Sequence, residues 1–227
     1  MGSDPLPLFF VATRLDPQNR MKDVTGILLA GGKSRRMGID KRFLTLGGDT
    51  LVQRALSVYE RLFTEILIVV AEPVPQLSDM GHQVVTDLIP NCATLGGLYT
   101  GLSLSRNPRV FAAACDMPFL NPDIIRHLIG CCDDDVVMPN LETGLQPMHA
   151  VYAKTCLPYF ERMMANNNLS IQAVLGHNEL QVRLVAEEVL RAFDPQLLSF
   201  LNLNTPEDAE LARQIVEQSG RQENDTP

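Results

Sequence analysis

The sequence has few features of metal-binding, membrane or nucleic-acid-binding proteins. Its five cysteines include no C-x-x-C pair, so neither a zinc site nor a disulfide framework is predicted, and reduced thiols in a cytoplasmic compartment fit best. No apolar run approaches the roughly 18–20 residues of a membrane span. A net charge of −8 argues against a nucleic-acid partner. We interpret all four histidines as structural, since they lack ligand spacing: His82, His127, His149 and His177.

Length and composition favour one α/β domain. A chain of 227 residues with 45% apolar residues can build a sizeable core. Residues 1–20 are interpreted as a disordered N-terminal extension, and Asp4 stands where a secretory signal would carry positive charge. The domain is expected to span residues 21–217, followed by a frayed polar tail at 218–227.

Short apolar runs alternate with helical patterns along the chain. Runs such as residues 66–70 are continuously apolar, which indicates strands buried on both faces of a parallel sheet. The expected strands are 24–30, 66–71, 82–86, 109–115, 135–138, 147–153, 181–185 and 199–203. The expected helices are 50–63, 96–105, one from 121, 154–166 and one from 205. This alternation predicts an α/β fold with a single doubly wound, mostly parallel sheet, and residues 139–147 are expected to form a loop over its carboxyl edge.

The most informative stretch is residues 26–41, GILLAGGKSRRMGIDK. An apolar run, residues 27–30, ends at Gly31 and Gly32, and five of the next nine residues are charged. Glycine lets backbone N–H groups approach an anion, and nearby cations neutralise it. The stretch therefore predicts a phosphate-binding turn. A βα turn with a solvated charged face is the alternative for a Gly-Gly pair taken alone.

Two better-known phosphate motifs do not fit this stretch. A P-loop needs a glycine at the position that Ile27 occupies. A G-x-G-x-x-G dinucleotide fingerprint is also absent, because Gly31 and Gly32 are adjacent and the next glycine is Gly38. A P-loop hydrolase and a dinucleotide-binding protein are therefore disfavoured.

Two aspartates follow predicted strands at the edge where ligands collect in open α/β sheets. Asp116 ends the apolar run of residues 110–115, where a carboxylate can hold Mg²⁺. Asp87 follows another strand and could bond a ribose or base, or share the metal. The alternatives are a structural cap for Asp116 and a turn former for Asp87.

Five motifs together resemble those of the molybdenum cofactor guanylyltransferases. They are LAGGKSRRMGIDK at 29–41, ATLGGL at 93–98, ACDMPF at 114–119, QPMHAVY at 146–152 and NLNTPED at 202–208. The resemblance implies a Rossmann-like nucleotidyltransferase fold and a cytoplasmic enzyme. The implied reaction transfers GMP from Mg-GTP to the terminal phosphate of molybdopterin-bound molybdenum, giving the guanine dinucleotide and pyrophosphate. It also implies transient contact with molybdoenzymes or other cofactor-biosynthesis proteins.

The resemblance also implies roles for individual residues. Lys41, Arg36 and Asp116 would be catalytic, with Asp116 as the Mg²⁺ ligand, and Asn202 and Asn204 would lie near the pterin. No general base is required, because a phosphomonoester is mostly dianionic at pH 7. The implied nucleotide-binding residues are Leu29, Ala30, Gly31, Gly32, Lys41, Asp87 and Asp116.

Two departures from the family pattern leave guanine recognition open. Ala71 stands where some members have an asparagine that helps bind the nucleotide, and Thr94 stands where a proline is frequent. A cytidylyl- or other nucleotidyltransferase of the same fold is one alternative, although the LAGG variant resembles GTP-using members more. A non-catalytic nucleotide-binding partner for molybdoenzyme maturation is the other.

Overall fold

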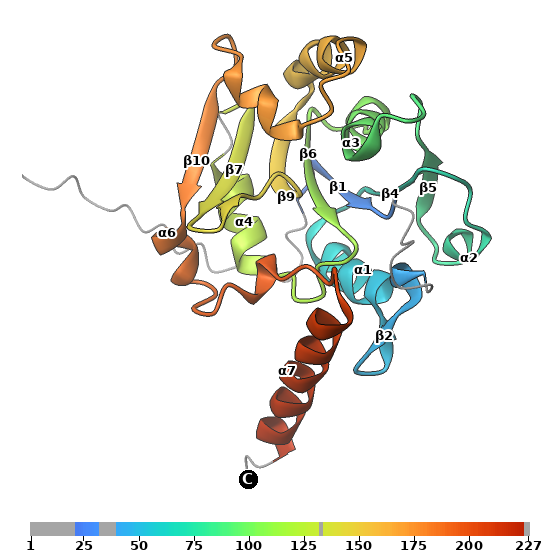
Figure 1. Cartoon of the computed structure of the whole chain (residues 1–227), viewed down its shortest axis with the longest axis vertical. Helices are drawn as coiled ribbons and strands as arrows, with labels where there is room; N and C mark the ends of the chain where they lie inside the picture. Colours follow the sequence, from blue (N-terminus) through green and yellow to red (C-terminus); the bar gives the residue numbers. More distant parts are fainter. Residues whose placement is uncertain (1–20, 32–39, 132–133, 225–227) are drawn as a thin grey trace, which may run out of the picture.

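A central sheet with helices on both faces forms the body of the molecule (Figure 1). The computed structural model describes residues 21–31, 40–131 and 134–224. Along the sheet the strands follow the order β10-β7-β9-β6-β1-β4-β5. Their bounds are β1 Val24–Leu29, β4 Ile66–Val70, β5 Gln83–Thr86, β6 Arg109–Ala114, β7 Val136–Leu141, β9 His149–Ala153 and β10 Val182–Ala186.

Only β9 runs antiparallel to its neighbours along this path, β6 and β7. The four remaining pairs in the path are parallel. A short strand, β8 (Gly144–Leu145), pairs antiparallel with β7, and β2 (Thr45–Leu46) and β3 (Asp49–Thr50) form a separate hairpin. The predicted doubly wound, mostly parallel sheet is thus confirmed.

The helices divide between the two faces of the sheet (Figure 1). α1 (Leu51–Leu62), α4 (Pro122–Gly130) and α6 (Glu187–Arg191) cover one face, and α3 (Ala93–Leu104) and α5 (Leu157–Ala165) cover the other. α7 (Pro206–Asn224) projects away from the sheet. The remaining helical segments are α2 (Pro75–Ser78) and the 3-10 helices η1 (Lys41–Phe43), η2 (Lys154–Cys156), η3 (Ile171–Gly176) and η4 (Leu198–Phe200).

The central strand β1 supplies side chains to two apolar cores. Leu28 packs in the core beneath α1 and α4, whereas Ile27 and Leu29 pack in the core beneath α3 and α5. Successive strand residues point to opposite faces, so a strand covered on both sides must be apolar throughout. This explains why β1 reads as a continuous apolar run.

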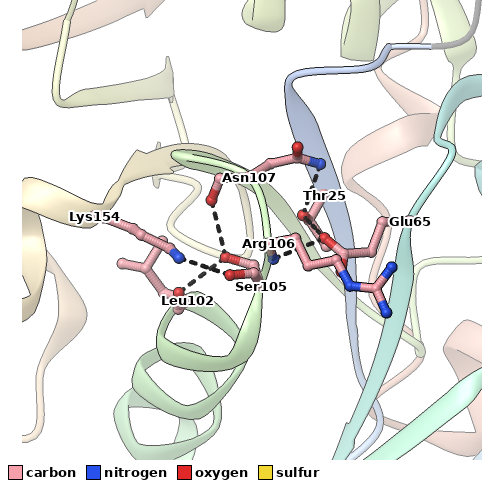
Figure 2. A network of polar contacts seen from close by, with 7 residues as sticks. All are labelled: Thr25, Glu65, Leu102, Ser105, Arg106, Asn107 and Lys154. Carbon is pink, nitrogen blue, oxygen red and sulfur yellow. Dashed lines mark hydrogen bonds and ion pairs between the residues drawn. The ribbon is translucent and has the colours of Figure 1, made fainter.

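A polar network fastens the sheet at the amino ends of the parallel strands (Figure 2). The Thr25 hydroxyl on β1 donates to the Glu65 carboxylate, which also accepts from the backbone N–H of Arg106 at 2.9 Å. Asn107 Nδ2 donates to Thr25 Oγ1 at 3.1 Å. Lys154, which follows β9, donates to the Ser105 carbonyl. These contacts join β1, β4, β6 and β9 at the end of the sheet opposite to the carboxyl ends.

The prediction of a strand at 199–203 is wrong. Residues 198–200 form η4, and the chain then runs irregularly to α7. The backbone N–H groups of this segment bond elsewhere. Ser199 donates to the Asp194 carboxylate at 2.8 Å, and Leu203 donates to the Asp116 carbonyl at 2.9 Å. Because these N–H groups already have partners, they are not available to a sheet ladder.

The expected loop at 139–147 is instead largely strand. β7 continues through Leu141 and turns back through β8, with Gly144 at a φ of 115° that favours glycine. Pro139 fits inside β7 because it acts as an acceptor, taking a hydrogen bond from Gln146 N at 3.0 Å. The helix expected at 96–105 begins three residues earlier, at Ala93.

The predicted domain boundaries remain predictions. Residues 1–20 and 225–227 lie outside the described residues, and the backbone of α7 is helical through Asn224. Within the described part of the chain, no helix combines the length and apolar character needed to cross a bilayer.

Gly26 allows α1 to approach β1 closely, and replacing it should destabilise the fold. A Cβ at Gly26 would lie 2.5 Å from Phe63 Cδ2 and 2.8 Å from Tyr59 Cδ1. Both rings are fully buried, and the Tyr59 hydroxyl donates to the Ile27 carbonyl, so neither can move aside cheaply. We expect Gly26→Ala to lower the free energy of unfolding in urea by about 1–3 kcal/mol.

Gly130→Ala is the matched control. A Cβ at Gly130, at the end of α4, meets nothing within 4 Å. Alanine there should leave stability unchanged or raise it by up to about 1 kcal/mol. Equal unfolding midpoints for Gly26→Ala and the wild type would show that the rings adjust without cost.

Candidate active site

The carboxyl ends of neighbouring strands bring the predicted residues together. The Ala30 N–H donates to the Val69 carbonyl at 2.8 Å, and the Cys115 N–H donates to the Leu29 carbonyl at 3.1 Å. Asp87 follows β5, and its backbone N–H donates to the Val70 carbonyl at 3.0 Å. The ladder therefore places the end of β1 between the segments that carry Asp87 and Asp116.

Two adjoining cavities open at this edge. They share Leu29, Gly31 and Thr94 in their walls. The larger, with a volume of about 490 Å³, contains Asp87, and the smaller, of about 330 Å³, contains Asp116. Volumes of this order suit small-molecule ligands. The other residues of the larger cavity are Val69, Ala71, Glu72, Pro90, Asn91, Ala93 and Gly97, and those of the smaller are Ala114, Cys115, Met117, Gln146, Pro147, Met148 and Asn202.

Asp87 presents a buried acceptor to the larger cavity. Its Oδ1 atom is buried and accepts no hydrogen bond from the described residues. Burial raises the pKa of this carboxyl above its ordinary value. A buried acceptor without a donor is uncommon in folded proteins, so a donor from a ligand would improve this site. Gly97 on α3 faces it, since a Cβ there would lie 3.6 Å from Oδ1.

Asp116 is the partly buried carboxylate of the smaller cavity. Burial raises its pKa, and the nearby Lys41 ammonium partly offsets that effect. The described residues contain no group of three or more His, Cys, Asp or Glu side chains able to hold a metal ion. A lone carboxylate still fits a divalent ion, because Mg²⁺ is usually bound through one or two carboxylates plus substrate phosphates and water.

Lys41 connects this carboxylate to the C-terminal segment. It opens η1, and its Nζ donates to the Leu203 carbonyl and lies 3.5 Å from Asn204 Oδ1. Leu203 N in turn donates to the Asp116 carbonyl. The segment that follows η4 is thereby fixed beside Asp116, and Asn202 reaches the wall of the smaller cavity.

Aromatic packing anchors the same segment to the sheet. The fully buried His149 ring lies between Phe111, at a centroid distance of 5.1 Å, and Phe200, at 4.8 Å. Burial lowers the pKa of His149 to about 3, so the ring is neutral at physiological pH. Phe200 precedes Asn202 by two residues. These ring contacts hold Phe200, and with it the segment that carries Asn202, against the core.

Not all of the predicted site residues line the two cavities. Ala30 is buried, and its N–H and carbonyl already bond Val69 and Arg42. Asn204 is exposed, and neither Ala30 nor Asn204 lines either cavity. Gly32 and Arg36 lie outside the described residues. The roles of all the site residues remain predictions.

The structure adds residues that the sequence did not assign. Gln146 lines the smaller cavity although its motif carried no predicted role. The Leu203 carbonyl accepts from Lys41, and Arg42 bonds the end of β1. A backbone carbonyl has no sequence signal. Arg42 follows the basic stretch of residues 26–41 directly, and the sequence predicted no role for it.

Residues 26–184 match the family model described as a MobA-like NTP transferase domain. The chain is 38% identical over 199 residues to a molybdenum cofactor guanylyltransferase of Desulfosudis oleivorans, covering 86% of this chain and 97% of that one. It is 34% identical over 200 residues to a probable molybdenum cofactor guanylyltransferase of Pelotomaculum thermopropionicum, covering 88% and 96%.

Solved structures agree with these relatives. Molybdopterin-guanine dinucleotide biosynthesis protein A from Archaeoglobus fulgidus has a TM-score of 0.76 at 27% identity, covering 86% of this chain and 100% of that one. A 2-C-methyl-D-erythritol 4-phosphate cytidylyltransferase from Thermus thermophilus shares the fold at a TM-score of 0.60 and 16% identity, covering 84% and 98%. The family resemblance and the nucleotidyltransferase class are confirmed. With a strand-end site of this form and such relatives over most of its length, the chain belongs to the MobA-like nucleotidyltransferases, among the molybdenum cofactor guanylyltransferases.

Proposed function

We propose that the protein transfers GMP from Mg-GTP to the terminal phosphate of molybdopterin-bound molybdenum, releasing pyrophosphate. The observation that carries this proposal is the pair of cavities that share Leu29, Gly31 and Thr94. A transfer between two substrates needs two sites that meet, because the reacting atoms must be held in contact and in line.

The larger cavity is the proposed nucleoside site. Its Asp87 offers the buried, unpartnered oxygen that a ribose hydroxyl or a base N–H would satisfy. The backbone of Leu29 and Gly31, which line both cavities, would hold the nucleotide, and the backbones of Ala30 and Gly32 are the further predicted contacts.

The smaller cavity is the proposed site of transfer. An oxygen of the pterin phosphate attacks the α-phosphorus of GTP, and the bond to the β-phosphate oxygen breaks with its electron pair leaving on pyrophosphate. Asp116 lines this cavity, and the positive charge of nearby Lys41 partly offsets the rise in the pKa of its carboxyl. Lys41, together with Arg36, would bind phosphate oxygens, and Asn202 and Asn204 would contact the pterin.

The barrier in such a reaction is the repulsion of two anions. Because the attacking phosphate is already mostly dianionic at neutral pH, the residues need not remove a proton. Their work is to align the phosphates and to supply positive charge in a site that is partly shielded from water. A Mg²⁺ ion held by Asp116 would supply further neutralisation of phosphate charge.

We also propose that the enzyme is cytoplasmic and contacts molybdoenzymes or other cofactor-biosynthesis proteins transiently when it hands over its product. The free thiols of Cys92, Cys115, Cys131 and Cys156 agree with a reducing compartment. The same fold serves cytidylyltransferases among the solved structures, so nucleotide choice is the first property to test.

Direct binding should show a preference for GTP. Titrating the protein with GTP, CTP and ATP in the presence of Mg²⁺, by calorimetry, should give tight binding for GTP alone. A preference for CTP would retain the fold and the transfer chemistry but would assign a cytidylyltransferase. Binding of GTP without magnesium-dependent pyrophosphate release in the presence of molybdopterin-bound molybdenum would instead indicate a non-catalytic partner.

Removing either charge in the transfer site should slow turnover. We expect Lys41→Ala and Asp116→Asn each to lower the rate of pyrophosphate release at saturating substrate by about 100-fold or more, since each deletes a preorganised electrostatic contact. Lys154→Ala is the matched control, because Lys154 Nζ also donates to a backbone carbonyl, that of Ser105, at the other end of the sheet. The control should stay within about twofold of wild type. Turnover within about tenfold of wild type for Lys41→Ala would remove it from the catalytic set.

Asp87→Asn should separate stability from binding. Because the pKa of Asp87 is raised in the folded protein, ionisation above that pKa costs stability, and stability is regained as the pH falls toward the ordinary aspartate value. The neutral amide avoids this cost, so the ligand-free variant should unfold at the wild-type temperature or higher at pH 7. Its GTP affinity should fall by about ten- to a hundredfold, the effect of losing a hydrogen bond to a charged group. Unchanged GTP affinity would place the nucleotide elsewhere.

A further inference from the structure

The side chain of Arg42 joins its own segment, which contains Asp40, to the end of β1. Its NH1 donates to the Ala30 carbonyl at 3.0 Å. Its Nε donates to Asp40 Oδ1 at 2.7 Å, and its NH2 bonds the other oxygen of the same carboxylate. The planar guanidinium therefore links Asp40 to the last buried residue of the central strand, and its side chain is only 19% exposed.

The bond to Ala30 constrains the next peptide. A trans peptide is planar, so the carbonyl of Ala30 and the N–H of Gly31 point in opposite directions. Holding that carbonyl on Arg42 therefore directs the Gly31 N–H away from Arg42. Gly31 lines both cavities. The bond from Arg42 to the Ala30 carbonyl thus helps to fix the direction of the Gly31 N–H.

The bond to Asp40 constrains Lys41. The Asp40 carboxylate also accepts from the backbone N–H of Arg42 at 3.2 Å, which caps η1. Lys41 lies between the two residues of this pair, at the first position of η1. Its backbone is consequently fixed at the point from which its side chain extends to Leu203, beside Asp116.

We propose that Arg42 is a positioning residue of the nucleotide site, which holds the Gly31 N–H and the Lys41 ammonium in the directions that bind phosphate. The inference rests on the proposed use of GTP. Arg42 itself contacts no substrate in this scheme. It acts through a backbone carbonyl and through Asp40.

An ordinary surface ion pair would not have these properties. Pairs of exposed charges contribute little, because water screens them and both side chains lose freedom. The Arg42–Asp40 pair is bidentate and adds a third bond to a strand end, a geometry that only a guanidinium fork provides. In agreement, the hydrogen bond from Arg42 lowers the pKa of Asp40.

The test compares GTP with guanosine, which lacks the phosphates. We would measure the affinity of both by calorimetry with Mg²⁺ for the wild type, Arg42→Ala, Arg42→Lys and Asp40→Asn. Arg42→Ala should weaken GTP binding about tenfold or more and guanosine binding by less than about twofold. Arg42→Lys should recover little, because one ammonium cannot bond both partners in the same plane. Asp40→Asn should show a smaller loss of the same kind, since the bond to Ala30 remains.

Arg126→Ala is the matched control. Arg126 also bonds an aspartate close in sequence, Asp123, at 2.9 Å, but it lies on the outer face of α4. Its removal should change neither affinity by more than about twofold. Thermal unfolding of each variant shows whether it is folded at the assay temperature.

Each outcome supports or overturns the inference. GTP binding by Arg42→Ala equal to wild type, or an equal loss for GTP and guanosine, would overturn it while leaving the proposed function intact. Full recovery in Arg42→Lys would reduce the role to one of charge alone and would also overturn it. Failure of the wild type to bind GTP would overturn the proposed function, and this inference with it. If Arg42→Ala does not fold, Arg42→Lys and Asp40→Asn decide by the same comparison.

Discussion

The burial of β1 on both faces is the constraint on which the rest of the structure depends. Hydrogen bonds to β4 and β6 and two apolar cores leave the strand no freedom to slide, because a shift of one residue would exchange its two faces. The backbone therefore reaches Ala30 at a fixed height and in a fixed direction. The position of Gly31 in the walls of both cavities depends on this fixed strand end. The polar network around Thr25 and Glu65 joins the strands at the opposite end of the sheet (Figure 2). The cavities lie at the carboxyl ends of the strands, away from this network.

The charged side chains of the candidate site have partners that a ligand could improve on or replace. Both acidic side chains, Asp87 and Asp116, are desolvated, which raises their pKa values and makes an incoming donor or cation favourable. Lys41 is satisfied by the Leu203 carbonyl rather than by a carboxylate side chain. A neutral acceptor is a weaker partner than a phosphate oxygen, so exchanging one for the other on nucleotide binding costs little. This is a general solution for a protein that is acidic overall and yet must bind a polyanion.

Much of the fold could be predicted from the sequence, because a doubly buried strand has an unmistakable composition. Ile66–Val70 and Val24–Leu29 were found in this way, and Asp116 was found because it ends such a run. The strand expected at 199–203 failed for the opposite reason. Its apolar residues serve different purposes: the Phe200 ring packs at a tilt against His149, while Leu203 enters a separate small core. Composition records that a residue is buried but not in which core.

The sequence could place acidic side chains at the candidate site, whereas it could not identify the backbone carbonyls that accept from Lys41 and Arg42. Asp87 and Asp116 stand out as acids after apolar strands, and the cavities indeed contain them. The Leu203 carbonyl could not be found in this way, since every residue has one. Arg42 was hidden for a related reason. Its partner is a carbonyl twelve residues earlier, and only the geometry shows which of several cations reaches it.

The small core around Leu203 brings an early segment of the chain, residues 46–51, together with a late one, residues 203–212. Leu46 from the β2–β3 hairpin, Leu51 from α1 and Ala212 from α7 enclose Leu203. Residues far apart in sequence are therefore packed into one unit immediately behind Lys41. The family model ends at residue 184, before this segment. The proposed nucleotide-binding residues Leu29, Gly31 and Asp87 lie within the matched range, whereas the wall that carries Asn202 is formed by the later segment. Because Lys41 donates to the Leu203 carbonyl and Leu203 N donates to the Asp116 carbonyl, a change in that segment would also be felt at the two charged residues of the candidate site.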